Sequence, residues 1–351
     1  MLKNKFSNIS DIIKDAKKGK MFILVDDKNR ENEGDLIIPG SKCNSKSINF
    51  MAKYGRGLIC LALTKKQVDN LKLPLMSPTN KSRMQTAFTI SIESAKGVTT
   101  GISAQDRAKT IKTAINLKAK KKDIVSPGHV FPLVSRNGGV LERAGHTEAS
   151  IDVSKLSNLN PSSVICEVMN EDGRMARLND LFKFSKKHKI KLASIEDLIS
   201  YRLKYEKLIS KISNKIFKLN NIGKINIYDY KNNFENNIHF AITKGVLDKN
   251  KSTAVRVLSI KLKNLNILNN TEIKKSLKIL AKYKSFLLLI INKKNKLVKD
   301  KKINTLRYYG IGAQIIKDLK VKNMILITRN RKKIIGLEGF GLKIVKQVII
   351  K

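Results

Sequence analysis

Three carboxylates lie within five positions in the segment Arg30-Glu31-Asn32-Glu33-Gly34-Asp35. The segment follows the apolar run 22–25, which predicts a strand, and the pair Asp26-Asp27. Carboxylate oxygens are the ligands that Mg²⁺ prefers, and Mg²⁺ usually takes only one or two of them from a protein. The same residues would also suit a solvated acidic turn between two strands. The acidic segment is therefore a candidate site for a metal and a polar substrate, and its interpretation depends on the other polar clusters.

A second polar cluster begins at Arg143 and ends at Ser150. His146 can ligate a metal as the neutral imidazole, and Gly145 lets the backbone approach a ligand closely. Arg143 and Thr147 suit a phosphate, because they combine a fork of donors with a hydroxyl beside a possible helix N-terminus. The alternative is a capping turn in which Thr147 is the N-cap of a short helix.

Two further residues have the chemistry of an acid–base pair. Glu167 interrupts an otherwise apolar strand predicted at 163–168, where desolvation raises the pKa of a carboxyl group unless the group is paired. It could equally face solvent on the polar side of that strand. His129 follows Ser126-Pro127-Gly128, a rigid turn that exposes the imidazole at the start of a predicted strand.

These clusters together define a reaction class. A Glu/Asp–His metal site, an Arg/Thr phosphate site and a separate His/Glu pair suit a small sugar phosphate. The metal would polarise a carbonyl or a diol, and the acid–base groups would move protons through an enediol. The sequence contains no nucleophile elbow, P-loop or GxGxxG fingerprint that would favour a hydrolase, a kinase or a dehydrogenase.

Short apolar segments separated by Gly, Pro, Thr and acidic residues fill the first 200 positions, as is typical of alternating strands and helices. Strands are predicted at 21–25, 57–63, 88–93, 129–134 and 163–168. Helices are predicted at 8–18, 46–54, 66–71, 103–116, 147–152 and 176–188. This alternation predicts an α/β or α+β fold for the first half of the chain.

The composition changes near residue 200, where segments rich in Lys, Asn and Ile begin. Ser194 is a predicted N-cap with Asp197 three residues later, so we predict a helix that runs to about Lys218 and joins the two halves. The segment 220–223 would end this helix. Further strands are predicted at 236–242, 254–260, 285–291 and 323–328, and further helices at 271–283 and 311–319.

The chain as a whole has 351 residues, 42% of them hydrophobic, which predicts two folded domains. Its three cysteines, Cys43, Cys60 and Cys166, lie far apart and suggest neither a disulfide framework nor a zinc site. The first twenty residues resemble an amphipathic helix rather than a signal peptide. The apolar run 286–292 is too short to span a bilayer. We therefore expect a cytoplasmic protein that does not associate with membranes.

The formal net charge is +43, and residues 201–351 hold 36 Lys and Arg against 8 Asp and Glu. A nucleic-acid-binding protein is one interpretation of this charge. Lysine is scattered among Asn and Ile, however, and no zinc-finger spacing, RNP-like aromatic motif or Gly-rich RNA-binding loop is present. We therefore expect no specific nucleic-acid partner, although the positive field should attract phosphorylated metabolites and bind polyanions non-specifically.

Seven segments of the first half carry a resemblance to a known family: VDDKNRENEGDL (25–36), GRGLICLALT (55–64), FTISIE (88–93), TTGISAQDRAKTI (99–111), PGHVFPL (127–133), GGVLERAGHTEAS (138–150) and VICEVMNEDGRMAR (164–177). They closely resemble 3,4-dihydroxy-2-butanone 4-phosphate synthase. The resemblance implies that D-ribulose 5-phosphate loses C4 as formate and yields the four-carbon precursor of riboflavin. It also implies an α/β fold, a homodimer and Mg²⁺, for which Mn²⁺ could substitute.

The same resemblance implies a role for individual residues. Glu31 and His146 are the expected metal ligands, and His129 and Glu167 are the expected catalytic residues. The expected substrate contacts are Arg30, Glu31, Asp35, Arg143, Ala144, Gly145, His146, Thr147 and Glu167. Glu33 and Cys60 are expected to lie close to the substrate.

The second half resembles the C-terminal part of GTP cyclohydrolase II through the segments 307–319 and 337–345. That enzyme needs three zinc cysteines, yet residues 201–351 contain none, and Lys261 stands where the first should be. Arg307 matches the catalytic arginine of that family, but Thr305 replaces its catalytic aspartate. We therefore expect a layered α/β synthase domain over 1–202 and a smaller, inactive cyclohydrolase-II-like α/β domain over 203–351, with no zinc. The alternative is a bifunctional enzyme that retains a GTP-binding or regulatory role in the second domain.

Overall fold

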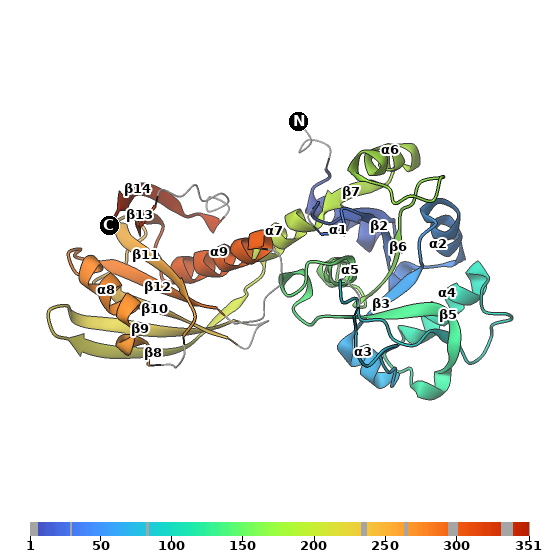
Figure 1. Cartoon of the computed structure of the whole chain (residues 1–351), viewed down its shortest axis with the longest axis horizontal. Helices are drawn as coiled ribbons and strands as arrows, with labels where there is room; N and C mark the ends of the chain where they lie inside the picture. The colour runs from blue at the N-terminus through green and yellow to red at the C-terminus, as the bar shows by residue number, and fades with distance from the viewer. Residues whose placement is uncertain are drawn as a thin grey trace. The chain divides into compact units, whose positions relative to one another are not determined.

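The protein is a mixed α/β chain with two β-sheets, as the computed structural model shows, and this confirms the predicted fold class (Figure 1). The structure describes residues 6–28, 30–81, 84–232, 237–262, 266–293, 301–330 and 340–350, without the side chains of 301–307. Two compact units are present, Met1–Ile199 and Ser200–Lys351. Within the described residues, no helix is both long enough and apolar enough to cross a membrane.

The first unit is built on a seven-stranded sheet with the strand order β4-β5-β3-β6-β2-β1-β7. Its strands are β1 (Phe22–Val25), β2 (Gly34–Pro39), β3 (Cys60–Thr64), β4 (Ile92–Ser94), β5 (Ile124–Ser135), β6 (Ser162–Glu167) and β7 (Lys191–Ser194). Every residue of β1 and β2 is buried. Because both faces of these central strands are covered, the sheet is the middle layer of the unit.

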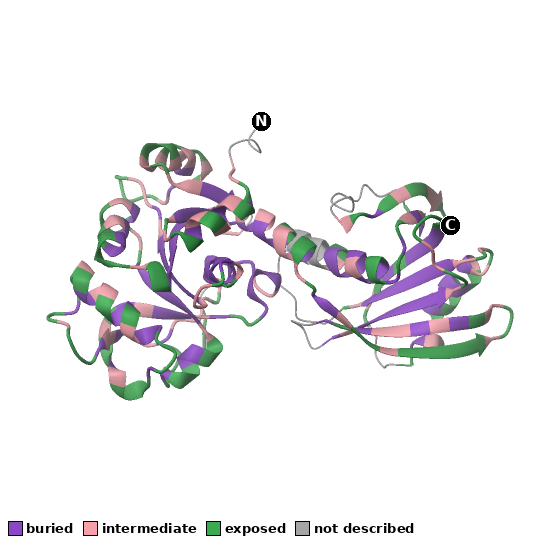
Figure 2. Cartoon of the chain, turned by 180° about the vertical axis from the view of Figure 1, so that it is seen from behind, coloured by how far each residue is buried: buried purple, intermediate pink, exposed green. Residues whose placement is uncertain are grey.

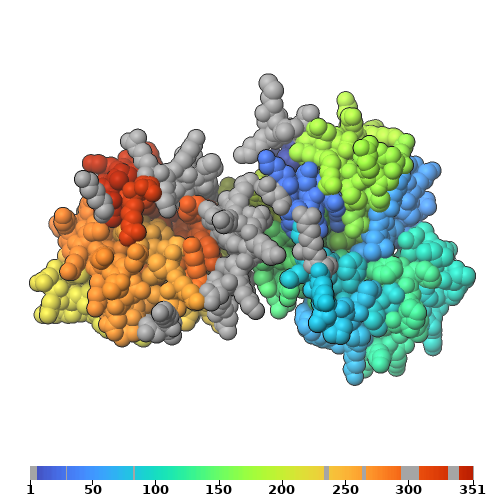
Figure 3. Space-filling model, in the orientation of Figure 1, coloured from blue at the N-terminus to red at the C-terminus, as the bar shows by residue number. Residues whose placement is uncertain are grey.

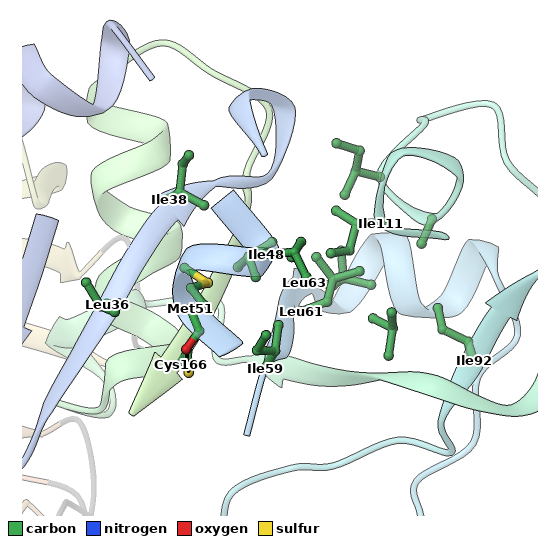
Figure 4. Packing of buried hydrophobic residues seen from close by; sticks show 14 of the residues in the cluster. Leu36, Ile38, Ile48, Met51, Ile59, Leu61, Leu63, Ile92, Ile111 and Cys166 are labelled. Carbon is green, nitrogen blue, oxygen red and sulfur yellow. Dashed lines mark hydrogen bonds between the residues drawn. The ribbon is translucent and has the colours of Figure 1, made fainter. Parts of the chain in front are cut away.

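Helices cover both faces of this sheet. They are α1 (Ile9–Lys17), α2 (Ser45–Phe50), α3 (Lys65–Asn70), α4 (Ala104–Ala114), α5 (His146–Leu156) and α6 (Leu178–His188). Alternate residues of β2, Leu36 and Ile38, pack with Ile48 of α2 and Ile111 of α4 in one apolar cluster (Figure 4). Helix α5 packs with α1 and contacts the central strands β2, β3 and β6. The first residues of α5 are thereby held next to the ends of these strands.

The second unit contains another seven-stranded sheet, with the order β14-β13-β11-β12-β10-β9-β8. Its strands are β8 (Ile209–Leu219), β9 (Gly223–Asn232), β10 (Ile238–Lys244), β11 (Ser252–Ile260), β12 (Phe286–Asn292), β13 (Asn323–Thr328) and β14 (Lys343–Ile349). Helix α8 (Thr271–Leu280) contributes Ile273 and Leu277 to one apolar cluster, and α9 (Lys301–Asp318) contributes Ile311 and Ile315 to another. The central strands are buried, whereas the edge strand β8 is largely exposed (Figure 2).

One predicted element is wrong. The helix expected from Ser194 to about Lys218 ends at Tyr205, as α7 (Ile195–Tyr205), and the following residues form strand β8. The predicted cap is present, because Ser194 Oγ accepts a hydrogen bond from the backbone N–H of Asp197 at 3.0 Å. The segment expected to end the helix instead connects β8 to β9 in a hairpin, in which Asn221 has a φ of 68°. The strands β2, β7, β9 and β14 were also not predicted.

The surface of the first unit mixes segments that are far apart in sequence, as the blue, cyan and green regions of the space-filling view show (Figure 3). In the second unit, helix α9 begins ten residues before the predicted start at 311. Two residues singled out there by the cyclohydrolase resemblance, Thr305 and Arg307, have side chains outside the described part of the chain. The segment 337–345 is described only from residue 340 onward.

Candidate active site

The acidic segment forms the connection between β1 and β2, and Asp26 organises it. The side chain of Asp26 is fully buried. Its Oδ2 accepts hydrogen bonds from Arg30 Nη1 at 2.6 Å and from the backbone N–H of Glu31 at 3.1 Å, and its Oδ1 accepts from the N–H of Glu33 at 3.0 Å. Arg30 also pairs with Glu31. The carboxylate of Asp26 therefore holds the loop from within, and its oxygens are already satisfied.

Glu31 and His146 come together although 114 other residues separate them in the sequence. His146 is the first residue of α5, whose N-cap is Gly145, so the alternative in which Thr147 is the N-cap is wrong. The Nδ1 atom of His146 lies 3.9 Å from Glu31 Oε2. Ligand atoms of Asp26, Glu31 and His146 all lie within 4.8 Å of one another. This spacing suits a single cation.

Asp35 is a third carboxylate near His146, in addition to Asp26 and Glu31. It is buried on β2, where its Oδ1 lies 3.6 Å from His146 Nδ1. Asp35 Oδ1 and His146 Nε2 are both buried and have no hydrogen-bond partner among the described residues. Burial raises the pKa of Asp35, and the carboxylates of Glu167 and Glu31 raise it further. Burial also lowers the pKa of His146, so the imidazole favours its neutral, ligating form.

Glu167 ends strand β6 and lies opposite Asp35 in the antiparallel pairing of β6 with β2. Its Oε2 accepts a hydrogen bond from the backbone N–H of Leu58 at 2.9 Å. Burial raises the pKa of Glu167, and the charge of Glu31 adds to this effect. The buried thiol of Cys60 also has a raised pKa, because of burial and then the charges of Glu167 and Asp35. Glu167 is therefore poised to exchange a proton nearer to neutral pH than an ordinary carboxyl group.

His129 lies on β5, and its imidazole is 45% exposed. Its Nδ1 atom is hydrogen-bonded to Glu93 Oε1 on β4. Among the described contacts, the side chains of His129 and Glu167 therefore have different partners and do not bond to each other. A substrate would have to lie between them for both to act on it.

Arg143 is held by three acceptors. Its Nη1 donates to Glu148 Oε2 at 2.7 Å, and its Nη2 donates to Met84 O and Thr86 Oγ1, both at 3.1 Å. Glu148 is 1% exposed and also accepts a hydrogen bond from the backbone N–H of Arg136 at 3.1 Å. Thr147 is buried in the first turn of α5, four residues after Arg143 in the chain. A helix N-terminus and a guanidinium both have the chemistry to bind an anion.

A cavity of about 660 Å³ opens beside the acidic loop. It is lined by Lys28, Arg30, Glu31, Asn32, Glu33, Met84, Thr86, Phe88 and Arg177. Glu33 lies on this wall, where burial and the charge of Glu31 raise its pKa. The cavity is large enough for a small phosphorylated sugar, and its mixture of basic and acidic side chains suits a polar ligand.

Three residues of this region were not identified as functional from the sequence: Glu93, Glu148 and Arg177. Glu148 stands one residue after Thr147, and Arg177 ends the last of the seven segments that carry the resemblance, so both were visible as charged residues. Their importance lies in the side chains that they contact, and these contacts depend on the pairing of distant elements. The sequence pattern alone therefore carried no signal for them.

Comparisons with known proteins agree with these observations. The family model described as 3,4-dihydroxy-2-butanone 4-phosphate synthase matches residues 10–201, and the one described as GTP cyclohydrolase II matches residues 267–349. The chain is 44% identical to a 3,4-dihydroxy-2-butanone 4-phosphate synthase of Photobacterium phosphoreum, over 97% of this chain and 99% of that protein. It is also 44% identical to the riboflavin biosynthesis protein RibBA of Aquifex aeolicus, over 99% of this chain and 93% of that protein.

Several solved structures are similar to this one. The crystal structure of RibBX, a two-domain 3,4-dihydroxy-2-butanone 4-phosphate synthase from A. baumannii, superposes with a TM-score of 0.81 at 36% identity and covers 98% of this chain and 99% of that one. A synthase structure in complex with two magnesium ions has a TM-score of 0.55 at 36% identity, over 57% of this chain and 99% of that one. The likeness to the two-domain structure extends over both units.

Proposed function

The chain belongs to the 3,4-dihydroxy-2-butanone 4-phosphate synthase family, and we propose that Glu31 and His146 hold the divalent metal of its active site. It is a synthase of riboflavin biosynthesis and converts D-ribulose 5-phosphate to L-3,4-dihydroxy-2-butanone 4-phosphate and formate. The observation that carries the metal assignment is the convergence of these two side chains around ligand atoms within 4.8 Å of one another.

The donor set fits a hard divalent cation. Glu31 offers a carboxylate oxygen, and His146 offers a ring nitrogen in the neutral form that its environment favours. Asp26 is the third member of the cluster, but its oxygens already accept hydrogen bonds from Arg30, Glu31 and Glu33, so its role is to shape the loop. The bound ion, Mg²⁺ or Mn²⁺, would polarise the carbonyl or the diol of the substrate. A synthase of the same family is known in complex with magnesium ions, which supports a divalent metal.

The substrate phosphate would bind where the N-terminus of α5 meets Arg143. The segment Arg143-Ala144-Gly145-His146-Thr147 provides a guanidinium, a hydroxyl and the N-terminal end of α5. Glu148 holds the guanidinium in place by its 2.7 Å hydrogen bond. The sugar hydroxyls would then face Arg30 and Asp35, which lie on either side of the metal ligand Glu31 in the sequence.

Proton transfer is the proposed task of His129 and Glu167. Burial raises the pKa of Glu167, so this residue can accept and return a proton during enediol formation. His129 is hydrogen-bonded to Glu93, which would orient its ring toward the substrate. With their separate partners, the two groups could serve different carbon atoms of the substrate. Cys60 and Glu33 would complete the wall of the site.

The second domain has no catalytic role in this proposal. Residues 201–351 contain no cysteine, so the thiolate zinc site of a cyclohydrolase cannot form there. We propose that residues 203–351 act as a non-catalytic cyclohydrolase-II-like domain, and that the protein works as a homodimer in the cytoplasm. It would need neither a nucleic acid nor a membrane.

Metal binding by single-residue variants tests the proposed site. Mn²⁺ titration followed by electron paramagnetic resonance should show one site in the wild type and its loss in Glu31→Gln and His146→Ala. Glu171→Gln is the matched control, because Glu171 is an 84% exposed carboxylate that pairs with Arg56 outside the metal cluster. Mn²⁺ binding that survives unchanged in both site variants would refute the assignment.

A further inference from the structure

Arg177 joins the acidic loop to a distant part of the chain. It precedes α6, and its Nη1 atom donates to the backbone oxygens of Glu31 at 2.7 Å and Asn32 at 2.9 Å. The same nitrogen lies 3.5 Å from Glu33 Oε1. One guanidinium thus contacts three successive residues of the loop, and the first of them is the proposed metal ligand.

Arg177 is itself held by the start of α6. Its backbone N–H donates to Asp180 Oδ2 at 3.0 Å, so Asp180 caps the helix and fixes the backbone of the arginine. Asp180 Oδ2 also accepts a hydrogen bond from Asn170 Nδ2 at 3.4 Å, across the turn that follows β6. The backbone of Arg177 is therefore linked, through Asp180, to the turn that follows Glu167.

The acidic loop needs such an external contact for two reasons. The ten residues 26–35 contain five carboxylates, and like charges repel one another. Asn32 adopts a left-handed conformation with a φ of 55°, which an L-residue adopts only at a cost. Asp26 satisfies backbone N–H groups of the loop, whereas Arg177 satisfies carbonyl groups and adds a positive charge.

We propose that Arg177 is a positioning residue that clamps the acidic loop so that the carboxylate of Glu31 faces His146. The proposal rests on the proposed function of Glu31 as a metal ligand. Fixing the carbonyl of Glu31 restricts the direction in which its own side chain leaves the backbone. The clamp acts on the metal ligand through the chain, in the way that outer contacts commonly orient ligands in metal sites.

Mn²⁺ affinity of purified full-length variants tests the clamp. Removing a contact that orients a metal ligand typically weakens binding about 10- to 100-fold. We expect Arg177→Ala to raise the Kd for Mn²⁺ by about tenfold or more, and Arg177→Lys to recover part of the loss, because lysine restores the charge without the guanidinium geometry. The backbone amides of the peptide spanning 26–35 should exchange hydrogen faster in Arg177→Ala, because the loop would no longer be held by the guanidinium. Thermal melting of each variant separates this effect from a failure to fold.

Arg174→Ala is the matched control. Arg174 lies on the same turn, is 83% exposed and pairs with Asp172, which lies outside the acidic loop. Wild-type Mn²⁺ affinity in Arg177→Ala, or a raised KM for the substrate at unchanged Mn²⁺ affinity, would overturn the clamp. If Glu31→Gln also binds Mn²⁺ normally, the metal assignment itself fails; if only Arg177→Ala does so, the clamp alone is wrong.

Discussion

Asp35 and Glu167 lie directly opposite each other on the antiparallel strands β2 and β6, and both are carboxylic acids with raised pKa values. Facing like charges in a sheet are destabilising, and burial increases their cost. Neither residue can have been placed there for the stability of the fold. We propose that metal, substrate and proton transfer meet at this end of the sheet.

Replacing Asp35 by Asn should make the protein more stable and less active. The change removes one of the facing charges and gives the buried position a side chain that can donate a hydrogen bond. We expect the metal-free protein to become more stable by about 1–3 kcal/mol, the usual cost of a buried unsatisfied group, while kcat/KM falls by about 100-fold or more. Thermal melts in EDTA and formate release report the two effects. A variant that is less stable than the wild type would contradict this account of the pair.

Replacing Glu93 by Gln should weaken catalysis through His129. Glutamine can keep a hydrogen bond to the ring, but it removes the negative charge beside a group that is proposed to transfer protons, so we expect kcat to fall by about tenfold or more. Mn²⁺ affinity should not change, because Glu93 is not part of the metal cluster. Steady-state kinetics at saturating metal measures the effect. An unchanged kcat would show that His129 does not depend on this partner.

The second unit should lose stability as the pH falls, because of His239. This histidine is fully buried on β10, where burial lowers its pKa to about 4, below the ordinary value of about 6.5. The folded form therefore binds fewer protons than the unfolded form between these two values, so stability is full above pH 6.5 and declines toward pH 4. Its contribution should fall by about 2 kcal/mol between pH 7.5 and 5.

Hydrogen exchange of the β10 and β12 peptides, corrected for the intrinsic effect of pH, measures this decline. His239→Asn is the informative variant, since the asparagine oxygen can replace Nδ1 as the acceptor for the backbone N–H of Asn292, now 3.2 Å away. The variant should flatten the pH dependence. An equally steep decline in His239→Asn would assign the effect to other groups.

The purified protein should not turn over GTP. Without a cysteine in residues 201–351, a thiolate zinc site cannot activate water in the second domain. We expect no formate or pyrophosphate from GTP and less than stoichiometric zinc by elemental analysis. GTP turnover together with one tightly bound zinc per chain would refute the inactive assignment and favour the bifunctional alternative.

A truncation at the domain boundary tests whether the second domain supports the first. Removing residues 206–351 leaves the whole of α7 and every strand of the first sheet in place. If the second domain has only an accessory role, kcat/KM for ribulose 5-phosphate should stay within a few-fold of the full chain, as measured by formate release at matched protein concentration. A loss of turnover in a folded truncation would assign the second domain a direct part in the reaction.

The sequence singled out residues that lie close together in the fold, although it missed several of the elements that position them. Glu31, His146 and Glu167 stand out because charged and ligating residues interrupt apolar segments, and burial raises the pKa of Glu167 as predicted. Strand β2 was missed because its first residues, Gly34 and Asp35, also have the composition of a turn. The functional loop and the strand overlap, so local pattern could not separate them.

The largest error has a physical cause in the residue spacing of β8. Ile209, Ile212, Ile216 and Leu219 have the spacing of a helical period, which is compatible with a continuation of α7. In the structure these residues form an edge strand paired with β9, and Ile212 and Ile216 are 50% and 58% exposed. Pairing with the next strand in a hairpin overrides the helical pattern. The partners Glu93 and Arg177 escaped prediction for a different reason, because their contacts depend on how segments far apart in the sequence pack.

The most direct test of the central claim is formate release from ribulose 5-phosphate by the purified full-length protein. We expect one formate per 3,4-dihydroxy-2-butanone 4-phosphate formed, loss of turnover in EDTA, recovery with Mg²⁺, and no turnover in Glu31→Gln at any Mg²⁺ concentration. The control Glu171→Gln should match the wild type. Near-normal formate release by folded Glu31→Gln would contradict the claim that this chain carries out its reaction at the Glu31–His146 centre.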